Sequence, residues 1–161
     1  MYGKEVVNML IIAHRCGTGK YPELTMEAAR HSLMLGADYV EMDVQYTVDD
    51  VPVICHDANA LRVFGKDMDI SQMTITEFLA LRHVTDKSFC SHALDHFLAA
   101  GIAPILLHCK IGGKYIEDIL LHLRRFDYED KVIMGVQSIE DVVITKNFNS
   151  DIPVLAFMRT Q

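Results

Sequence analysis

Short apolar runs of strand length alternate with amphipathic helical segments along the whole chain. The runs that predict strands are residues 8–13, 37–47, 51–55, 103–110, 130–137 and 152–158. Helical periodicity falls between them, at residues 25–36, 74–82, 94–101, 114–126 and 138–148. Alternation of this kind predicts an α/β fold, in which helices pack on a largely parallel sheet.

One connection is too short for a parallel crossover. Only Val48, Asp49 and Asp50 separate the second and third strand segments, whereas a parallel crossover needs about a dozen residues. The third segment is therefore predicted to fold back as a hairpin on the end of the second. This places His56 and Asp57 near the mouth of the sheet, where strand ends hold the reactive groups of α/β folds.

Length, charge and cysteine content limit the function further. A chain of 161 residues is predicted to form one domain. Its formal net charge of −7 argues against nucleic-acid partners and anionic membranes, which need an excess of Lys and Arg. No stretch reaches the ~20 apolar residues of a spanning helix, and the first apolar run is too short for a signal peptide. With four scattered cysteines, expected as free thiols, the chain is predicted to be cytoplasmic.

Polar side chains interrupt two of the predicted strands. Side chains two residues apart share one face of a strand, so Glu41 and Asp43 are predicted to point the same way, as are His108 and Lys110. Both pairs converge if the apolar side chains face the helices. Neighbouring ionised carboxylates repel, and a divalent cation is the commonest way to hold both. A histidine is an acceptable third ligand for a transition metal.

His14 and His56 each end a predicted strand and are expected to flank this metal. Two histidines can divide the work of general base and general acid near neutral pH. Arg15 and Lys110 offer positive charge for a phosphate. Together these residues suit phosphodiester cleavage. Each one also has a plainer interpretation, as a structural histidine, a solvated strand face or a surface ion pair.

Three motifs, AHRCGTGKYPELTMEAA, GADYVEMDVQYTVDDVPVICHD and ILLHCK, resemble the glycerophosphodiester phosphodiesterase family in their order and spacing. That family has an Ala-His-Arg-Gly start, a Pro-Glu-Asn-Thr helix entry, a Glu-x-Asp strand, a Val-x-x-His-Asp hairpin and a Glu-x-Lys strand. The resemblance implies a TIM-type barrel with a bound divalent metal. It also implies a small-molecule glycerophosphodiester substrate, hydrolysed to an alcohol and glycerol 3-phosphate.

The resemblance assigns roles to individual residues of this sequence. They are His14 and His56 as catalytic histidines, Glu41 and Asp43 as metal ligands, Arg15 and Lys110 as phosphate contacts, and Glu23 as the glutamate of the helix entry. In the family, a neighbouring hydroxyl of the substrate attacks phosphorus and gives a cyclic phosphate that water then opens.

Three positions depart from the family pattern. Cys16 stands in place of Gly, Leu24 in place of the helix-entry Asn, and His108 in place of the third carboxylate ligand. Loss of a carboxylate weakens a site for Mg²⁺ or Ca²⁺, the ions expected first, and makes Mn²⁺ or Zn²⁺ the alternative. The departures also support a second hypothesis: a non-catalytic or degenerate member that binds metal or phosphodiester, or that serves as an interaction module.

The length predicts an incomplete barrel. A full (β/α)₈ barrel takes ~250 residues, and residues 1–161 provide about five of its eight strands plus the hairpin. A partial barrel exposes strand edges and apolar lumen residues. A partner, a second copy of the chain in a homo-oligomer, or a further piece of the protein is expected to cover them. A third hypothesis, an unrelated open α/β sheet, requires the motif match to be accidental.

Overall fold

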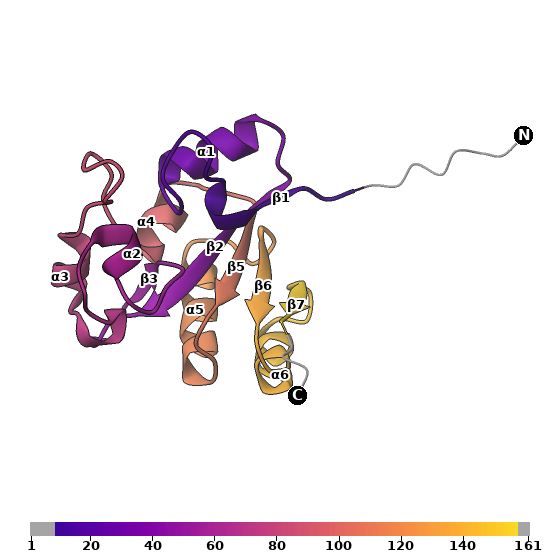
Figure 1. Ribbon diagram of the computed structural model, residues 1–161. Helices are drawn as coiled ribbons and strands as arrows, with labels where there is room; N and C mark the ends of the chain where they lie inside the picture. The colour runs from indigo at the N-terminus through magenta and orange to yellow at the C-terminus, as the bar shows by residue number, and fades with distance from the viewer. Residues whose placement is uncertain (1–8, 158–161) are drawn as a thin grey trace, which may run out of the picture.

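A single mixed sheet forms the centre of the molecule (Figure 1). The computed structural model describes residues 9–157, so Asn8 and Met158, the outer ends of the predicted first and last strands, lie outside the described residues. The strands are β1 Ile12–Ala13, β2 Tyr39–Tyr46, β3 Pro52–Ile54, β4 His92–Ala93, β5 Ile105–Cys109, β6 Val132–Val136 and β7 Val154–Ala156. The helices are η1 His14–Cys16, α1 Met26–Met34, α2 Leu61–Phe64, η2 Ile70–Gln72, α3 Ile75–Leu79, α4 Leu94–Ala99, α5 Lys114–Arg125 and α6 Ile139–Phe148.

The main strands form an open run of parallel neighbours, in the order β1, β2, β5, β6, β7. Within the described residues, β1 pairs only with β2, and β7 pairs only with β6. This parallel run therefore ends in two edge strands, as predicted. Apolar side chains are exposed beside both: Leu10 and Ile11 lie next to β1, and Leu155 and Phe157 lie at β7. In the described part of the chain, no helix is long and apolar enough to cross a membrane.

The predicted hairpin is confirmed. Strand β3 pairs antiparallel with the end of β2, with Val44 opposite Ile54 and Tyr46 opposite Pro52. The structure adds β4, which pairs antiparallel with β3 and which the sequence did not indicate, because two residues are too few to show a period. Between β3 and β4, the segment that contains α2, η2 and α3 packs around its own small apolar cluster. This segment projects to the left of the sheet in Figure 1.

Strict alternation along β2 separates the two faces of the sheet. Val40, Met42 and Val44 are buried in the main apolar core, on the face that α5 and α6 cover. The core-facing side chains of α5 are those that its periodicity predicts: Ile116, Ile119, Leu120 and Leu123. Glu41 and Asp43 lie on the opposite face, which is the inside of the incomplete barrel.

Polar side chains cap the first turns of three helices. Thr74 and Glu77 form the predicted capping box at α3, and the hydroxyl of Ser138 accepts the backbone N–H of Asp141 at α6. Thr25 caps α1 in the same way. Each cap satisfies backbone donors that would otherwise lack a partner, and this fixes where the helix begins.

Candidate active site

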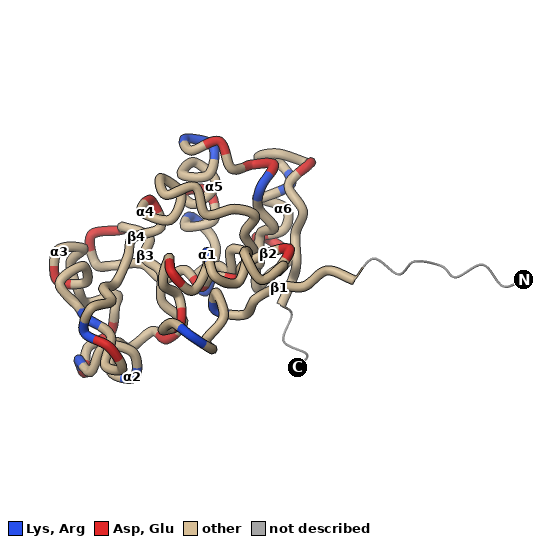
Figure 2. Tube along the Cα trace, turned by 90° about the horizontal axis from the view of Figure 1, so that it is seen from above, with Lys and Arg blue, Asp and Glu red and all other residues tan. Residues whose placement is uncertain are grey.

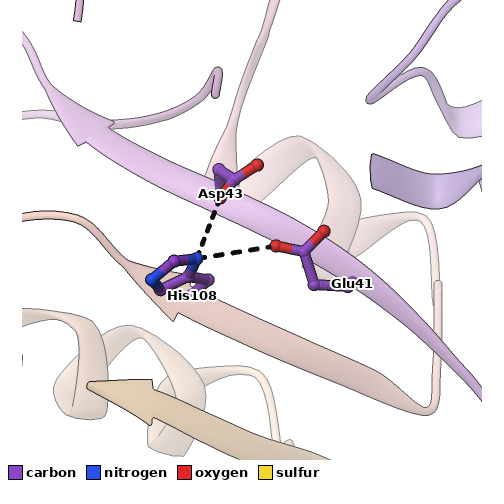
Figure 3. Close-up of side chains that lie close together, drawn as sticks. All are labelled: Glu41, Asp43 and His108. Atoms are coloured by element: carbon purple, nitrogen blue, oxygen red, sulfur yellow. Dashed lines mark ion pairs between the residues drawn. The ribbon is translucent and has the colours of Figure 1, made fainter. Parts of the chain in front are cut away.

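Glu41, Asp43 and His108 converge on the inner face of the sheet (Figure 3). Parallel pairing of β2 with β5 sets Asp43 directly opposite His108. Nδ1 of His108 lies 3.1 Å from Oδ1 of Asp43 and 3.8 Å from Oε1 of Glu41. One potential ligand atom from each residue lies within 4.8 Å of the others. The structure therefore brings together the three residues that the sequence proposed as metal ligands.

Lys110 joins this cluster, with its Nζ atom 2.9 Å from Oδ1 of Asp43. Burial raises the pKa of Asp43, but the neighbouring His108 and Lys110 more than offset it and hold that pKa below its usual value. Burial lowers the pKa of His108, but Asp43 and Glu41 offset it in turn and the pKa is raised. The Lys110 ammonium, together with His108 when its ring is protonated, thus offsets the charge of the two carboxylates.

The residues of this cluster fit a divalent cation. Both carboxylate oxygens of Asp43 are buried, and no described residue donates a well-directed hydrogen bond to either, although cationic nitrogens lie close by. A buried anionic oxygen without a directed donor is costly unless a cation coordinates it. Two carboxylates with one imidazole form a mixed oxygen and nitrogen donor set, which suits a transition metal better than Ca²⁺.

Phe157 covers His108 from the side of β7. Its ring stacks on the imidazole with 4.2 Å between the ring centroids. Gly135 leaves the space for this contact, because a Cβ atom there would lie 3.0 Å from the Phe157 ring and 3.2 Å from the His108 backbone. The end of the last described strand thus forms part of the wall around the metal cluster.

The turn after β1 places Arg15 beside the cluster. Arg15 and Cys16 both adopt left-handed backbone conformations, with φ of 51° and 62°, and the Arg15 N–H donates to Oε2 of Glu41 at 2.7 Å. Glycine adopts this conformation most easily, which accounts for the family's Gly at position 16. Here Cys16 takes it instead, with a fully buried side chain. Burial also raises the pKa of the Cys16 thiol, so this cysteine is not an activated nucleophile.

Leu24, at the helix entry, also adopts a left-handed backbone conformation. Its φ is 56°, a left-handed value that Asn tolerates better than other side chains with a Cβ. The Leu24 side chain is buried against the main core, and its burial offsets the backbone cost. Cys16 and Leu24 therefore both adopt left-handed conformations that the family's Gly and Asn adopt more easily.

Arg15 also contacts the second candidate histidine. Its Nη2 atom lies 2.9 Å from Nε2 of His56, and Nδ1 of His56 lies 2.6 Å from Oδ1 of Asp57. The imidazole therefore donates from Nδ1 to Asp57 and accepts at Nε2 from Arg15. His14 begins η1 and is exposed. Among the described residues, no hydrogen bond joins the side chain of His14 to His56.

Sequence reasoning missed Arg62, at the start of α2. Arg62 binds Asp57 through Nε and Nη2, and it binds Glu23 at 2.7 Å and 3.0 Å. Hydrogen bonds from Arg62 lower the pKa of Asp57 to about 2. Burial raises the pKa of Glu23, but Arg62 and Arg15 outweigh it and the pKa is lowered. A short helix inside a loop-like segment gave no periodic signal that could have indicated these contacts.

A cavity of about 520 Å³ opens beside Glu23 and Arg62. It lies between the loop before α1 and the segment before β4, and Tyr21, Val84 and Phe89 are among its other lining residues. Basic and acidic residues are interspersed along the described chain (Figure 2). The cavity shares this mixed character, because Lys20 and Arg62 line it together with Glu23 and Asp86.

The raised pKa of His108 predicts a pH-dependent stability in metal-free buffer. Because the folded state holds this proton more tightly than the unfolded state, His108 stabilises the fold fully below the usual histidine pKa of about 6.5. That contribution is lost as the pH rises through the raised pKa. Urea denaturation should therefore show a larger difference in unfolding free energy between the chain and a His108→Gln variant in mild acid than in mild alkali. A difference that does not change with pH would contradict this prediction.

Comparisons with known proteins agree with this geometry. The model of the glycerophosphoryl diester phosphodiesterase family matches residues 14–152. Lysophospholipase D GDPD1 from Homo sapiens is 29% identical over 157 residues, covering 89% of this chain and 50% of its own length. Lysophospholipase D GDPD3 from Mus musculus is 40% identical over 158 residues, covering 89% and 48%. The chain thus spans about half the length of these curated relatives.

Solved structures share the fold at lower identity. A glycerophosphodiester phosphodiesterase from Agrobacterium tumefaciens superposes with a TM-score of 0.78 at 22% identity, over 91% of this chain and 65% of its own. An Oleispira antarctica phosphodiesterase in complex with the product sn-glycerol-3-phosphate gives 0.78 at 19% identity, over 95% and 66%. The incomplete TIM-type barrel predicted from the sequence is confirmed. The chain belongs to the glycerophosphoryl diester phosphodiesterase family.

Proposed function

We propose that this chain catalyses the hydrolysis of glycerophosphodiesters to an alcohol and sn-glycerol 3-phosphate. The main observation behind the proposal is that the cluster of Glu41, Asp43 and His108 lies beside the pair of Arg15 and His56, joined to it by the Arg15 N–H. Relatives named lysophospholipase D and glycerophosphocholine phosphodiesterase support this substrate class. The product held by the Oleispira antarctica structure supports it as well.

Arg15 and Lys110 are proposed to bind the phosphate. The planar guanidinium suits two phosphate oxygens at once, and the ammonium adds a point charge. Because Arg15 lies 2.9 Å from Nε2 of His56, a phosphate bound to Arg15 would lie within reach of His56.

His56 is proposed as the general base. Its Nδ1 proton is held by Asp57, so Nε2 is the unprotonated nitrogen. Arg15 donates to Nε2 in the structure, and once a phosphate binds the Arg15 guanidinium in its place, Nε2 is proposed to accept the proton of the substrate hydroxyl that attacks phosphorus. As the bond from phosphorus to the leaving oxygen breaks, the exposed His14 is proposed to protonate that oxygen and release the alcohol. Water then opens the cyclic phosphate, with the two histidines in reversed roles.

Glu41, Asp43 and His108 are proposed to hold a divalent cation, which when bound would stabilise the negative charge on the phosphoryl oxygens. Glu41 has a second task in this arrangement, because its Oε2 atom also accepts the Arg15 N–H. That bond keeps the phosphate-binding turn against the ligand cluster.

The cavity beside Glu23 is proposed to receive the alcohol group. The rings of Tyr21 and Phe89 meet edge to face with 6.1 Å between their centroids, and Lys20 already places its ammonium 5.2 Å from the Tyr21 ring centre. Aromatic faces beside carboxylates suit an alkylammonium headgroup such as choline. Glu23 and Asp86 supply those carboxylates.

One observation favours a second function, binding without catalysis. Lys110 and His108 lie 2.9 Å and 3.1 Å from Oδ1 of Asp43 and offset its charge within the protein, His108 when its ring is protonated. A cluster that is balanced in this way gains less from a metal ion than one with three carboxylates. A non-catalytic phosphodiester-binding module is the alternative proposal.

Turnover of glycerophosphocholine tests the two functions against each other. With Mg²⁺, Ca²⁺, Mn²⁺ or Zn²⁺ present, the chain should release glycerol 3-phosphate, and His14→Ala or His56→Ala should each slow the reaction by about 10²- to 10⁴-fold. His96→Ala, an exposed histidine on α4, should have little effect. Release no faster than in His14→Ala would exclude catalysis. Calorimetric binding of glycerol 3-phosphate without turnover would support the alternative.

The ligand set predicts an unusual metal preference. The wild-type chain should bind Zn²⁺ or Mn²⁺ more tightly than Ca²⁺, because imidazole is a poor ligand for a hard ion. His108→Glu restores a third carboxylate and should raise Ca²⁺ affinity while lowering the preference for Zn²⁺. Isothermal titration of both proteins measures this. If His108→Glu changed neither the Ca²⁺ nor the Zn²⁺ affinity, His108 would not be a ligand of the ion.

Partial filling of the cavity should weaken binding of glycerophosphocholine but not of glycerol 3-phosphate, which lacks the alcohol group. Val84→Trp places a large ring in the proposed alcohol site, so KM for glycerophosphocholine should rise about tenfold, the cost of about 1.4 kcal/mol of lost binding. Affinity for glycerol 3-phosphate should stay the same. Leu121→Trp, at an exposed position on α5, is the matched control. An unchanged KM in Val84→Trp would refute this assignment.

A further inference from the structure

Five side chains form a closed ring at the edge of the proposed phosphate site. Arg15 contacts His56, His56 contacts Asp57, Asp57 contacts Arg62, Arg62 contacts Glu23, and Glu23 returns to Arg15. The ring contains two guanidinium groups, two carboxylates and one imidazole. Arg62 is not a neighbour of Arg15 in the ring, yet it binds both carboxylates.

The contacts of Glu23 are unequal. Its carboxylate lies 2.7 Å and 3.0 Å from the Arg62 nitrogens but 3.4 Å from Nη1 of Arg15. Charge-assisted bonds are strong at the shorter distances and weaken at the longer one. Arg62 therefore takes most of the hydrogen-bonding capacity of a carboxylate that could otherwise hold Arg15.

The contacts of Asp57 act on His56, the partner of Arg15. Nε and Nη2 of Arg62 bind the two oxygens of Asp57 side by side, which fixes the plane of the carboxylate. The same Oδ1 atom lies 2.6 Å from Nδ1 of His56. A carboxylate fixed in this way determines which ring nitrogen of the histidine bears the proton.

We propose that Arg62 is a positioning residue that acts on both members of the proposed catalytic pair. It draws Glu23 away from Arg15, which leaves the Arg15 guanidinium available to phosphate, and it orients Asp57 so that His56 presents an unprotonated Nε2. The inference rests on the proposed phosphate-binding role of Arg15. A purely structural role, in which Arg62 only pins α2 to the loop before α1, is the competing explanation.

Removal and rescue distinguish these roles. In Arg62→Gln, Glu23 has only Arg15 as its cation, so affinity for sn-glycerol 3-phosphate should fall about 10- to 100-fold. Addition of Glu23→Gln removes the competitor and should restore most of that affinity, whereas a lost structural tether would not be repaired by a second deletion. Arg62→Lys keeps the positive charge but cannot form the paired bonds of a guanidinium to each carboxylate, so it should give an intermediate loss. Arg125→Gln, an exposed arginine on α5, is the matched control.

The proton position on His56 supplies a readout that needs no turnover. Nitrogen-15 NMR of the wild-type chain should show the Nδ1–H form of His56, and Arg62→Gln should shift it toward a mixture of the two tautomers. Circular dichroism checks that each variant folds, and Arg62→Lys takes the place of Arg62→Gln if the latter does not. If Glu23→Gln gives no rescue and the His56 tautomer is unchanged, Arg62 has only a structural role. If the affinity is rescued and the His56 tautomer shifts, but the chain does not turn over glycerophosphocholine, the proposed function fails and this inference stands.

Discussion

The pairing of β2 with β5 determines the arrangement of the candidate site. These strands run parallel in a register that sets Asp43 opposite His108, and the alternation of the strands turns both side chains away from the helices. A shift of one residue in this register would send the carboxylates into the apolar core and break the cluster. The buried Val40, Met42 and Val44 prevent such a shift, because they can pack only against the helices. The apolar core on one face of the sheet thereby fixes the geometry of the polar site on the other face.

Much of this architecture could be predicted, because it depends on local patterns. The hairpin followed from the short connection after β2, and the capped starts of α3 and α6 followed from Thr74 and Ser138. The convergence of Glu41, Asp43 and His108 required only strand parity and a parallel sheet. Arg62 could not be predicted, because its contacts depend on how a loop-bound helix folds back over Glu23. The sequence holds no period or spacing that specifies such a contact.

The departures from the family pattern fall into two physical kinds. Cys16 and Leu24 occupy left-handed backbone positions where the family has residues that tolerate them, and both offset the conformational cost by burying their side chains. His108 differs, because it changes the charge of the ligand cluster and not the backbone path. The first two substitutions are matters of folding, and the third alone concerns the chemistry of the site.

The bond from the Arg15 N–H to Glu41 would link the two proposed binding equilibria, that of the metal and that of the phosphate. The carboxylate that would coordinate a cation also accepts the hydrogen bond of the turn that would bind the phosphate. Binding at one site would therefore change the binding free energy at the other. Such coupling is reciprocal: whatever factor the metal contributes to phosphate affinity, phosphate must contribute to metal affinity. An ion that binds weakly to the free chain would then be retained mainly while substrate is present. The metal would then bind together with the substrate and dissociate when the product leaves.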